Sequence, residues 1–156
     1  MMHVVLVEPE IPGNTGNIAR LCAATGASLH LVRPLGFSVD DKHLRRAGLD
    51  YWHLLDIHYY DSVEEVLAEY PDSPRYLLTT HAAKSYSRVH YGPDSLLIFG
   101  KESAGLAPAF REAHREECVR IPMVPEARSL NLANSVAVVL YEALRQNDFD
   151  LQEGTI

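Results

Sequence analysis

The chain has 156 residues, of which 47% are hydrophobic and 22% are charged, a composition typical of a folded globular protein. A chain of this length can bury its own core, so we expect a single domain spanning residues 1–156. The formal net charge of −7 argues against non-specific binding of nucleic acid over the whole surface but is compatible with a local basic patch. No segment has the uninterrupted apolar length of a membrane span. The first residues lack the features of a signal peptide, which predicts a cytoplasmic protein.

The two cysteines and eight histidines give no sign of a metal site. Cys22 and Cys118 each lie in an apolar stretch without a second cysteine nearby, as expected for buried free thiols of a cytoplasmic protein. The histidines do not pair at metal-ligand spacing on any predicted helix. We therefore predict no metal, and we expect the isolated His81 and His90 to lie in solvent.

Strand-like and helix-like segments alternate along the chain. Short apolar runs indicate buried strands, and segments with helical spacing of apolar residues lie between them. Residues 13–16 are typical of a turn ahead of the first helix. The pattern predicts strands at 3–7, 28–32, 57–60, 75–80, 95–99 and 118–121, and helices at 17–25, 40–47, 63–70, 108–117 and 129–146. This alternation predicts an α/β fold with a mostly parallel sheet, helices on both faces and 57–60 as a short edge strand.

The segment 129–146 has no Gly or Pro and is rich in Ala, Leu and Val, which favours a helix. Apolar residues form one stripe at helical spacing, and Val138, Val139 and Ala143 add apolar side chains on its flank. A helix that is apolar on nearly every side must be covered by more than one surface. We predict a homodimer through this helix; a core helix of a monomer is the alternative. The stripe consists of Leu132, Ala133, Val136, Ala137, Leu140, Tyr141 and Leu144.

Three loops follow predicted strands at one edge of the sheet, at 78–80, 100–105 and 121–129. A parallel α/β sheet binds its ligand beyond the carboxyl ends of its strands, so we expect one pocket built from these loops. The segment 100–106 lacks the Lys-Ser/Thr of a P-loop and the first glycine of a nucleophile elbow, and no G-x-G-x-x-G follows the first strand. The polar or conformationally special residues that remain at this edge are Asn14, Arg20, Gly100, Glu102, Ser129 and Asn131.

Three stretches carry a resemblance to a known family. PEIPGNTGNIARLCAATG, FGKESAGL and IPMVPEARSLNLANSVAVVLYEALRQ resemble, in order, the three motifs of the SPOUT methyltransferases. The intervening LGFSVDDKHLRRAGLDYW is similar to the TrmL-like (YibK-like) tRNA 2′-O-methyltransferases. The resemblance implies an α/β domain with a C-terminal trefoil knot. It also implies methyl transfer from S-adenosylmethionine to the ribose 2′-hydroxyl of the wobble nucleotide, a cytidine or modified uridine at position 34 of leucine tRNAs.

The resemblance also implies roles for individual residues. Arg20, the second residue of an N-x5-R motif, is the expected catalytic residue. Its guanidinium has a pKa above about 12 and is therefore a poor base, so we expect it to hold a phosphate and stabilise the developing alkoxide. A surface arginine on an amphipathic helix is the alternative. Asn14, Asn131 and Glu102 are expected to assist catalysis, and Glu102 could instead only favour a helix start. The cofactor is expected to contact Leu78, Thr79, Gly100, Ile121, Met123, Ser129 and Leu130.

The expected RNA partner is the anticodon stem-loop. The densest basic cluster lies near Tyr51 and Trp52, which could stack on unpaired bases, although a solvated helix face explains the charges equally well. Alternatives are a SPOUT methyltransferase for another RNA position, in tRNA or rRNA, and a non-catalytic RNA- or nucleotide-binding module. The residues predicted to bind RNA are Arg33, Lys42, Arg45, Arg46 and Arg128.

Overall fold

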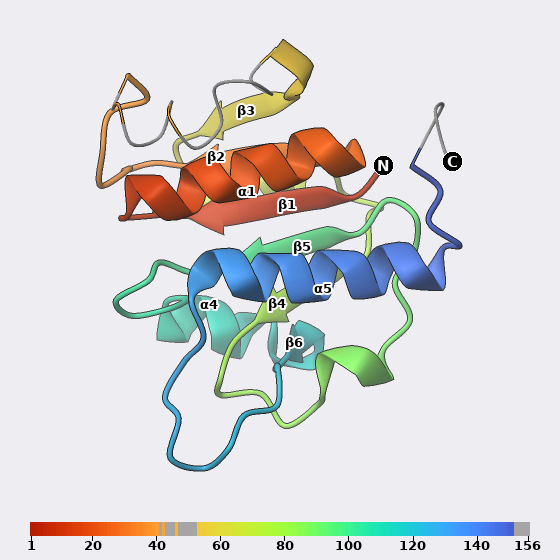
Figure 1. The fold of residues 1–156 in the computed structure, drawn as a ribbon. Coiled ribbons are helices and arrows are strands. Elements are labelled where there is room, and N and C mark those ends of the chain that lie inside the picture. Colours follow the sequence, from red (N-terminus) through yellow and green to blue (C-terminus); the bar gives the residue numbers. More distant parts are fainter. Residues whose placement is uncertain (41, 43–45, 47–52, 152–156) are drawn as a thin grey trace.

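Six strands form one sheet in the order β3-β2-β1-β5-β4-β6. The computed structural model describes residues 1–40, 42, 46 and 53–151. Every strand pairing is parallel, which confirms the predicted α/β sheet, and β3 is an edge strand as expected. Figure 1 shows the strands with helices packed against them. The strands are β1 (His3–Val7), β2 (Ser28–Val32), β3 (Ile57–Tyr60), β4 (Arg75–Leu78), β5 (Leu96–Phe99) and β6 (Cys118–Val119).

Helices α1 (Pro12–Thr25) and α5 (Leu132–Gln146) lie side by side on one face of the sheet (Figure 1). They bury the alternate strand residues Val4, Leu29 and Leu97 in one apolar core. On α5 the buried face consists of Leu132, Val136, Val139, Leu140, Ala143 and Leu144. Burial of this continuous apolar stripe explains why α5 packs here rather than standing in solvent.

The opposite face of the sheet carries α3 (Val63–Glu69) and α4 (Pro108–Ala113). A second core joins Val5 and Ile98 of the strands to Val66 of α3 and Phe110 of α4. Because successive residues of a strand point to opposite faces, β1 and β5 supply apolar side chains to both cores. Helices on both faces are therefore confirmed. In the described ranges no helix combines the length and apolar character needed to cross a membrane.

Several element boundaries differ from the predicted ones. The helix expected at 17–25 already begins at Pro12, so 13–16 is helical and not a turn. Proline is favoured at the first helical position because its missing N–H would have no partner there. The helix expected at 108–117 ends at Ala113 and a separate 3₁₀ turn follows at Arg115–Glu117, because His114 leaves helical backbone geometry. Of the helix expected at 40–47, residues 41, 43–45 and 47 lie outside the described residues, and residues 42 and 46 are helical.

The C-terminal helix also differs from its prediction. It begins at Leu132 and not at 129, and Asn131 caps it by accepting a hydrogen bond from the Asn134 N–H at 3.2 Å. Tyr141, expected in the buried stripe, is 44% exposed, whereas Val139 is fully buried. Helical rotation carries the buried face from Val136 to Val139 and Leu140, and this places Tyr141 on the far side.

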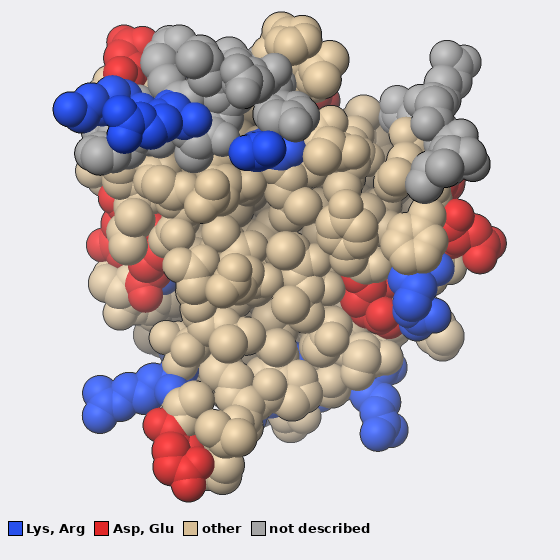
Figure 2. Space-filling view, viewed as in Figure 1, with Lys and Arg blue, Asp and Glu red and all other residues tan. Residues whose placement is uncertain are grey.

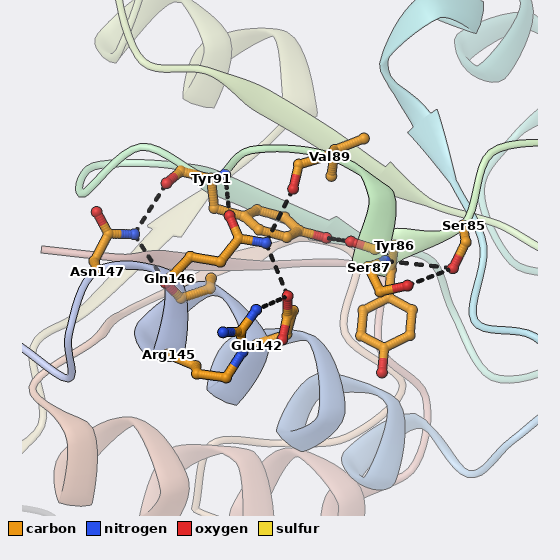
Figure 3. Close-up of polar contacts among 10 residues, drawn as sticks. Ser85, Tyr86, Ser87, Val89, Tyr91, Glu142, Arg145, Gln146 and Asn147 are labelled. Carbon is orange, nitrogen blue, oxygen red and sulfur yellow. Dashed lines mark hydrogen bonds and ion pairs between the residues drawn. The ribbon is translucent and has the colours of Figure 1, made fainter.

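The connection between β4 and β5 is tied to the C-terminal end of α5 (Figure 3). The Gln146 side chain accepts from the Tyr91 N–H at 2.9 Å and donates to the Val89 carbonyl at 3.0 Å. Asn147 donates to the Tyr91 carbonyl at 2.9 Å. The Tyr91 hydroxyl donates to the Tyr86 carbonyl at 2.6 Å. Residues 86–91 pair with no strand of the described sheet, and the Gln146 and Asn147 side chains supply hydrogen bonds to their backbone instead. The segment is thereby held against α5.

Candidate active site

A cavity of about 580 Å³ lies beyond the carboxyl ends of β4, β5 and β6, against the start of α5. The three loops that the sequence placed at this edge all contribute to it, as expected for a ligand site of a parallel sheet. Apolar side chains and polar groups share its wall. All seven residues predicted to contact the cofactor line this cavity, namely Leu78, Thr79, Gly100, Ile121, Met123, Ser129 and Leu130. Asn14, Glu102, Arg128 and Asn131 line it as well.

Gly100 stands where two stretches of backbone come into contact. A Cβ atom built on it would lie 2.1 Å from the carbonyl carbon of Gly105 and 2.2 Å from the Leu106 nitrogen. The loop closes on itself there, because the Gly105 N–H donates to the Lys101 carbonyl at 2.8 Å. Gly105 adopts φ 71°, a conformation that favours glycine. Both glycines are therefore required by the path of the cavity wall.

Three predicted catalytic residues form one hydrogen-bonded chain. The Asn14 side-chain amide donates to Glu102 at 3.1 Å, and the Asn14 amide oxygen accepts from the Asn131 side chain at 3.1 Å. Glu102 also accepts from the backbone N–H groups of Glu10 at 2.8 Å and Ile11 at 3.0 Å. Since Asn131 caps α5, this chain links α1, the loop after β5 and α5 at the wall of the cavity.

Glu10 belongs to the same network and was not predicted from the sequence. Its carboxylate accepts hydrogen bonds from the Ser103 backbone N–H at 2.8 Å and the Ser103 hydroxyl at 3.0 Å. These two bonds, the backbone one foremost, hold the pKa of Glu10 below its usual value. The available signal was its position in the first motif, an acidic residue two positions before the start of α1.

Arg20 is placed differently from the other predicted catalytic residues. It lies exposed on α1, six residues beyond Asn14. It is absent from the described residues that line the cavity of its own chain. The structure therefore brings Asn14, Glu102 and Asn131 together and leaves Arg20 on the neighbouring surface.

The described residues that were predicted to bind RNA have different surroundings. Arg33 pairs with Asp61 at 3.2 Å and its guanidinium lies 5.4 Å from the centre of the Tyr59 ring. Arg128 lies at the cavity instead. Lys42 and Arg46 are exposed, and Arg45 lies outside the described residues. Figure 2 shows Lys and Arg side chains at the margins of the face that carries α1 and α5, with an uncharged area at its centre.

The two cysteines and the two isolated histidines lie as predicted. Cys22 and Cys118 are buried free thiols, and burial raises the pKa of both. His81 and His90 are exposed. Among the residues that the structure describes, no group of three or more His, Cys, Asp or Glu could hold a metal ion.

A parallel α/β sheet with a cavity at its carboxyl edge is the architecture of a ligand-binding α/β enzyme, and comparison with known proteins identifies the family. The chain matches the model of the SpoU rRNA Methylase family over residues 1–141 and belongs to that family. The predicted resemblance is confirmed at this level.

Two relatives are similar over nearly their whole length, and a third over little more than half of its chain. The tRNA (cytidine(34)-2′-O)-methyltransferase of Polaromonas sp. (strain JS666 / ATCC BAA-500) is 51% identical over 152 residues, 96% of this chain and 93% of that protein. A solved structure described as giving structural insights into the 2-OH methylation of C/U34 on tRNA is 41% identical with a TM-score of 0.89, covering 95% of this chain and 97% of that one. The SpoU methyltransferase AviRb from Streptomyces viridochromogenes, in complex with the cofactor AdoMet, is 30% identical with a TM-score of 0.80. That match covers 94% of this chain and 57% of AviRb.

Proposed function

We propose that the chain transfers a methyl group from S-adenosylmethionine to the ribose 2′-hydroxyl of nucleotide 34, a cytidine or modified uridine, in leucine tRNAs. One observation carries the proposal: the residues that the family resemblance assigns to the cofactor line one cavity, beside the Asn14–Glu102–Asn131 chain. The relative from Polaromonas is named for this reaction on cytidine 34 of tRNA. A tRNA substrate supports the expected cytoplasmic location, and the single sheet supports one catalytic domain.

The cavity suits a cofactor that has both apolar and polar parts. Leu78 and Ile121 offer apolar surface, whereas Thr79 and Ser129 offer polar groups. The absent side chain at Gly100 lets ligand and backbone come close. Cofactor sites of this kind are largely apolar, with a few well-placed polar groups that fix orientation. S-adenosylmethionine supplies the methyl group as a sulfonium; no metal is required for that chemistry.

The chain's own groups align and stabilise the transfer. The ribose oxygen attacks the methyl carbon, the carbon–sulfur bond breaks, and the hydroxyl proton is lost to a base. Alignment of oxygen, carbon and sulfur can remove roughly 7–11 kcal/mol of barrier in favourable cases. We assign Arg20 to the phosphate beside the ribose and to the developing alkoxide, which its exposed position on α1 supports. Asn14, Glu102 and Asn131 hold the wall of the cavity in place.

The active form is proposed to be a homodimer through α5. The exposed residues of this helix, Asn134, Val138, Tyr141 and Arg145, follow one another at helical spacing. Val138 is 38% and Tyr141 44% exposed, and both lie at the middle of that stripe. The surrounding face is free of charged side chains at its centre (Figure 2), as expected for the core of an interface.

A trefoil knot is also part of the proposal. The contacts of Gln146 and Asn147 with Val89 and Tyr91 tie α5 to the β4–β5 connection (Figure 3). The segment at 84–86 pairs in turn with Arg120, directly after β6. The chain after β6 therefore contacts the β4–β5 connection at two places, first at Arg120 and again at Gln146 and Asn147. These two contacts support threading of the C-terminal part through that connection.

The RNA surface is proposed to include Arg33, Lys42, Arg45, Arg46 and Arg128. An anticodon loop offers splayed bases and closely spaced phosphates, which suit arginine side chains. Because the chain carries a net charge of −7, binding should be modest and strongly weakened by salt.

Incubation with methyl-labelled S-adenosylmethionine and bulk tRNA, followed by nuclease mapping, tests the function. The expected result is label in the 2′-O-methyl group of nucleotide 34 of leucine tRNAs. Label at another tRNA position, or none, would contradict the proposal. The family description names rRNA, so a parallel incubation with rRNA tests the second candidate, and label only there would favour it.

A further inference from the structure

Two segments at the cavity hold each other through reciprocal carboxylate contacts. Glu102, in the loop after β5, accepts the backbone N–H groups of Glu10 at 2.8 Å and Ile11 at 3.0 Å. In return, Glu10 accepts the backbone N–H of Ser103 at 2.8 Å and its hydroxyl at 3.0 Å. Each carboxylate therefore fixes the backbone of the segment that carries the other carboxylate. We call these four contacts the Glu10–Glu102 clamp.

The loop held by the clamp needs an anchor. Every residue from Gly100 to Leu106 lines the cavity, while Ser103, Ala104 and Gly105 are exposed on its outer side. Within the loop, the Gly105 N–H donates to the Lys101 carbonyl at 2.8 Å. That bond shapes the loop but attaches it to nothing else. The clamp joins this wall of the cavity to the backbone just ahead of α1, beside the bond from Asn14 of α1 to Glu102 at 3.1 Å.

Gly36 supports Glu10 from the other side. A Cβ atom on Gly36 would lie 2.8 Å from both the Cα and the carbonyl oxygen of Glu10, closer than real Cβ contacts. The Gly36 N–H also donates to the Pro9 carbonyl at 2.9 Å. The backbone at 9–11 therefore lies between Gly36 and the loop after β5, so Glu10 cannot shift toward Gly36.

We propose that Glu10 is a positioning residue for methyl transfer. It locks the cavity wall to α1 and so holds Glu102 and Asn14 in the arrangement that orients cofactor and ribose. Glu10 does not itself line the cavity in the described part of the chain, so it acts through Ser103 and Glu102. The inference rests on the proposed function, because it names what keeps that same site in order.

Steady-state kinetics of the full chain with tRNA and S-adenosylmethionine test the role. Glu10→Ala should lower kcat by roughly 10- to 100-fold, since a misplacement of about 1 Å costs up to about 10²-fold. The KM for tRNA should stay near the wild-type value, because the RNA surface is untouched. Glu10→Gln should recover most of kcat, since its amide oxygen can still accept the Ser103 N–H.

Glu8→Ala is the matched control. It removes the same charge from the same segment, and its ion pair with Lys101 at 3.8 Å reaches the same loop from outside the clamp. It should keep kcat within about twofold of wild type, because exposed ion pairs contribute little. If Glu8→Ala lost as much kcat as Glu10→Ala, the effect would come from the lost negative charge alone, and the proposal would be overturned.

Gly36→Ala should displace the Glu10 backbone, and with it the Glu10 carboxylate, without removing any carboxylate from the chain. It should reproduce the kcat loss of Glu10→Ala with little change in the KM for tRNA. Wild-type kcat in either Gly36→Ala or Glu10→Ala would overturn the inference. Calorimetry with S-adenosylhomocysteine, the demethylated product of the cofactor, separates failure of the proposed function from failure of the positioning role of Glu10. If wild type neither binds it nor methylates tRNA, the proposed function fails; if it does both and Glu10→Ala matches it, only the positioning role fails.

Discussion

Two polar networks on the described sheet differ in their surroundings: one lines a cavity and the other is buried. At the carboxyl edge, Asn14, Glu102 and Asn131 bond to one another and also line a cavity. Toward the amino edge of the other face, His30 is fully buried between His3, at 3.0 Å, and the Tyr60 hydroxyl, at 2.8 Å. The first network faces space for a ligand, whereas the second is closed on itself.

The difference follows from how each network meets its hydrogen-bonding needs. A buried polar group is tolerated when partners within the protein satisfy its hydrogen bonds, and His3 and Tyr60 do so for His30. The His58 ring also stacks on the His30 ring, with the two ring centres 5.0 Å apart. It should therefore contribute to stability and not to catalysis. At the carboxyl edge, the polar groups sit beside a cavity, so changes there should affect activity more than stability.

Arg20→Ala should produce the largest effect. If Arg20 stabilises the developing alkoxide, its loss should slow methyl transfer by at least about 10²–10³-fold, as for loss of one oxyanion donor. Binding of S-adenosylhomocysteine should be unchanged, because Arg20 does not line the cavity. Single-turnover rates and calorimetry measure the two separately. Methylation at the wild-type rate would remove Arg20 from the mechanism.

Gly100→Ala should weaken cofactor binding by about 100-fold or more. The added Cβ would lie 2.1 Å from the carbonyl carbon of Gly105. The backbone of the cavity wall must therefore move, either away from the cavity or into it. Calorimetry with S-adenosylhomocysteine gives the dissociation constant. Gly13→Ala is the control and should bind as wild type does, because Gly13 is not among the described residues that line the cavity and a Cβ on it would meet nothing within 4 Å. Unchanged affinity in Gly100→Ala would show that the cofactor does not depend on this wall.

His30→Gln should change the pH dependence of stability and leave methyl transfer at pH 7.5 nearly intact. Burial first, and then the neighbouring His3 and His58, lower the pKa of His30 to about 3, from about 6.5 in an unfolded chain. Below pH 6.5 the unfolded state binds more protons, so the free energy of unfolding should fall as pH drops toward 3. Since one pKa unit corresponds to about 1.4 kcal/mol, the fall should amount to a few kcal/mol.

Urea unfolding between pH 7.5 and 4.5 measures this slope. The slope should be shallower in His30→Gln than in wild type. His81→Gln, at an exposed histidine, should run parallel to wild type. Equal slopes in wild type and His30→Gln would show that the buried network does not couple folding to pH.

Val138→Asp should have the smallest effect on the isolated chain, because Val138 is 38% exposed on α5. In a dimer built on this face it would bury an unpaired carboxylate, which is strongly unfavourable. Sedimentation at micromolar concentration should show dimers for wild type and monomers for the variant. Arg145→Gln, at the end of the same stripe, should remain dimeric. A monomeric wild type would contradict the proposed assembly.

Local patterns predicted much of the fold and part of the site. The strand at 3–7 and the edge strand at 57–60 were recognisable from their own residues. The place of Gly100 at a pocket followed from its position just after a predicted strand, and its expected contact with the cofactor followed from family resemblance. The Glu10–Ser103 contact could not be predicted in this way, because its partners are 93 residues apart. The histidine network was missed for a related reason: parallel register brings His30 opposite His58, and no spacing within one segment reveals it.

The central claim is that the cofactor lies in the cavity at the carboxyl edge, against the loops after β4, β5 and β6. A crystal structure of the chain soaked with S-adenosylhomocysteine measures this directly. The predicted result is density along Leu78, Gly100 and Ser129, with the sulfur turned toward the α1 side of the cavity. Density elsewhere on the molecule, or none at saturating concentration, would contradict the account.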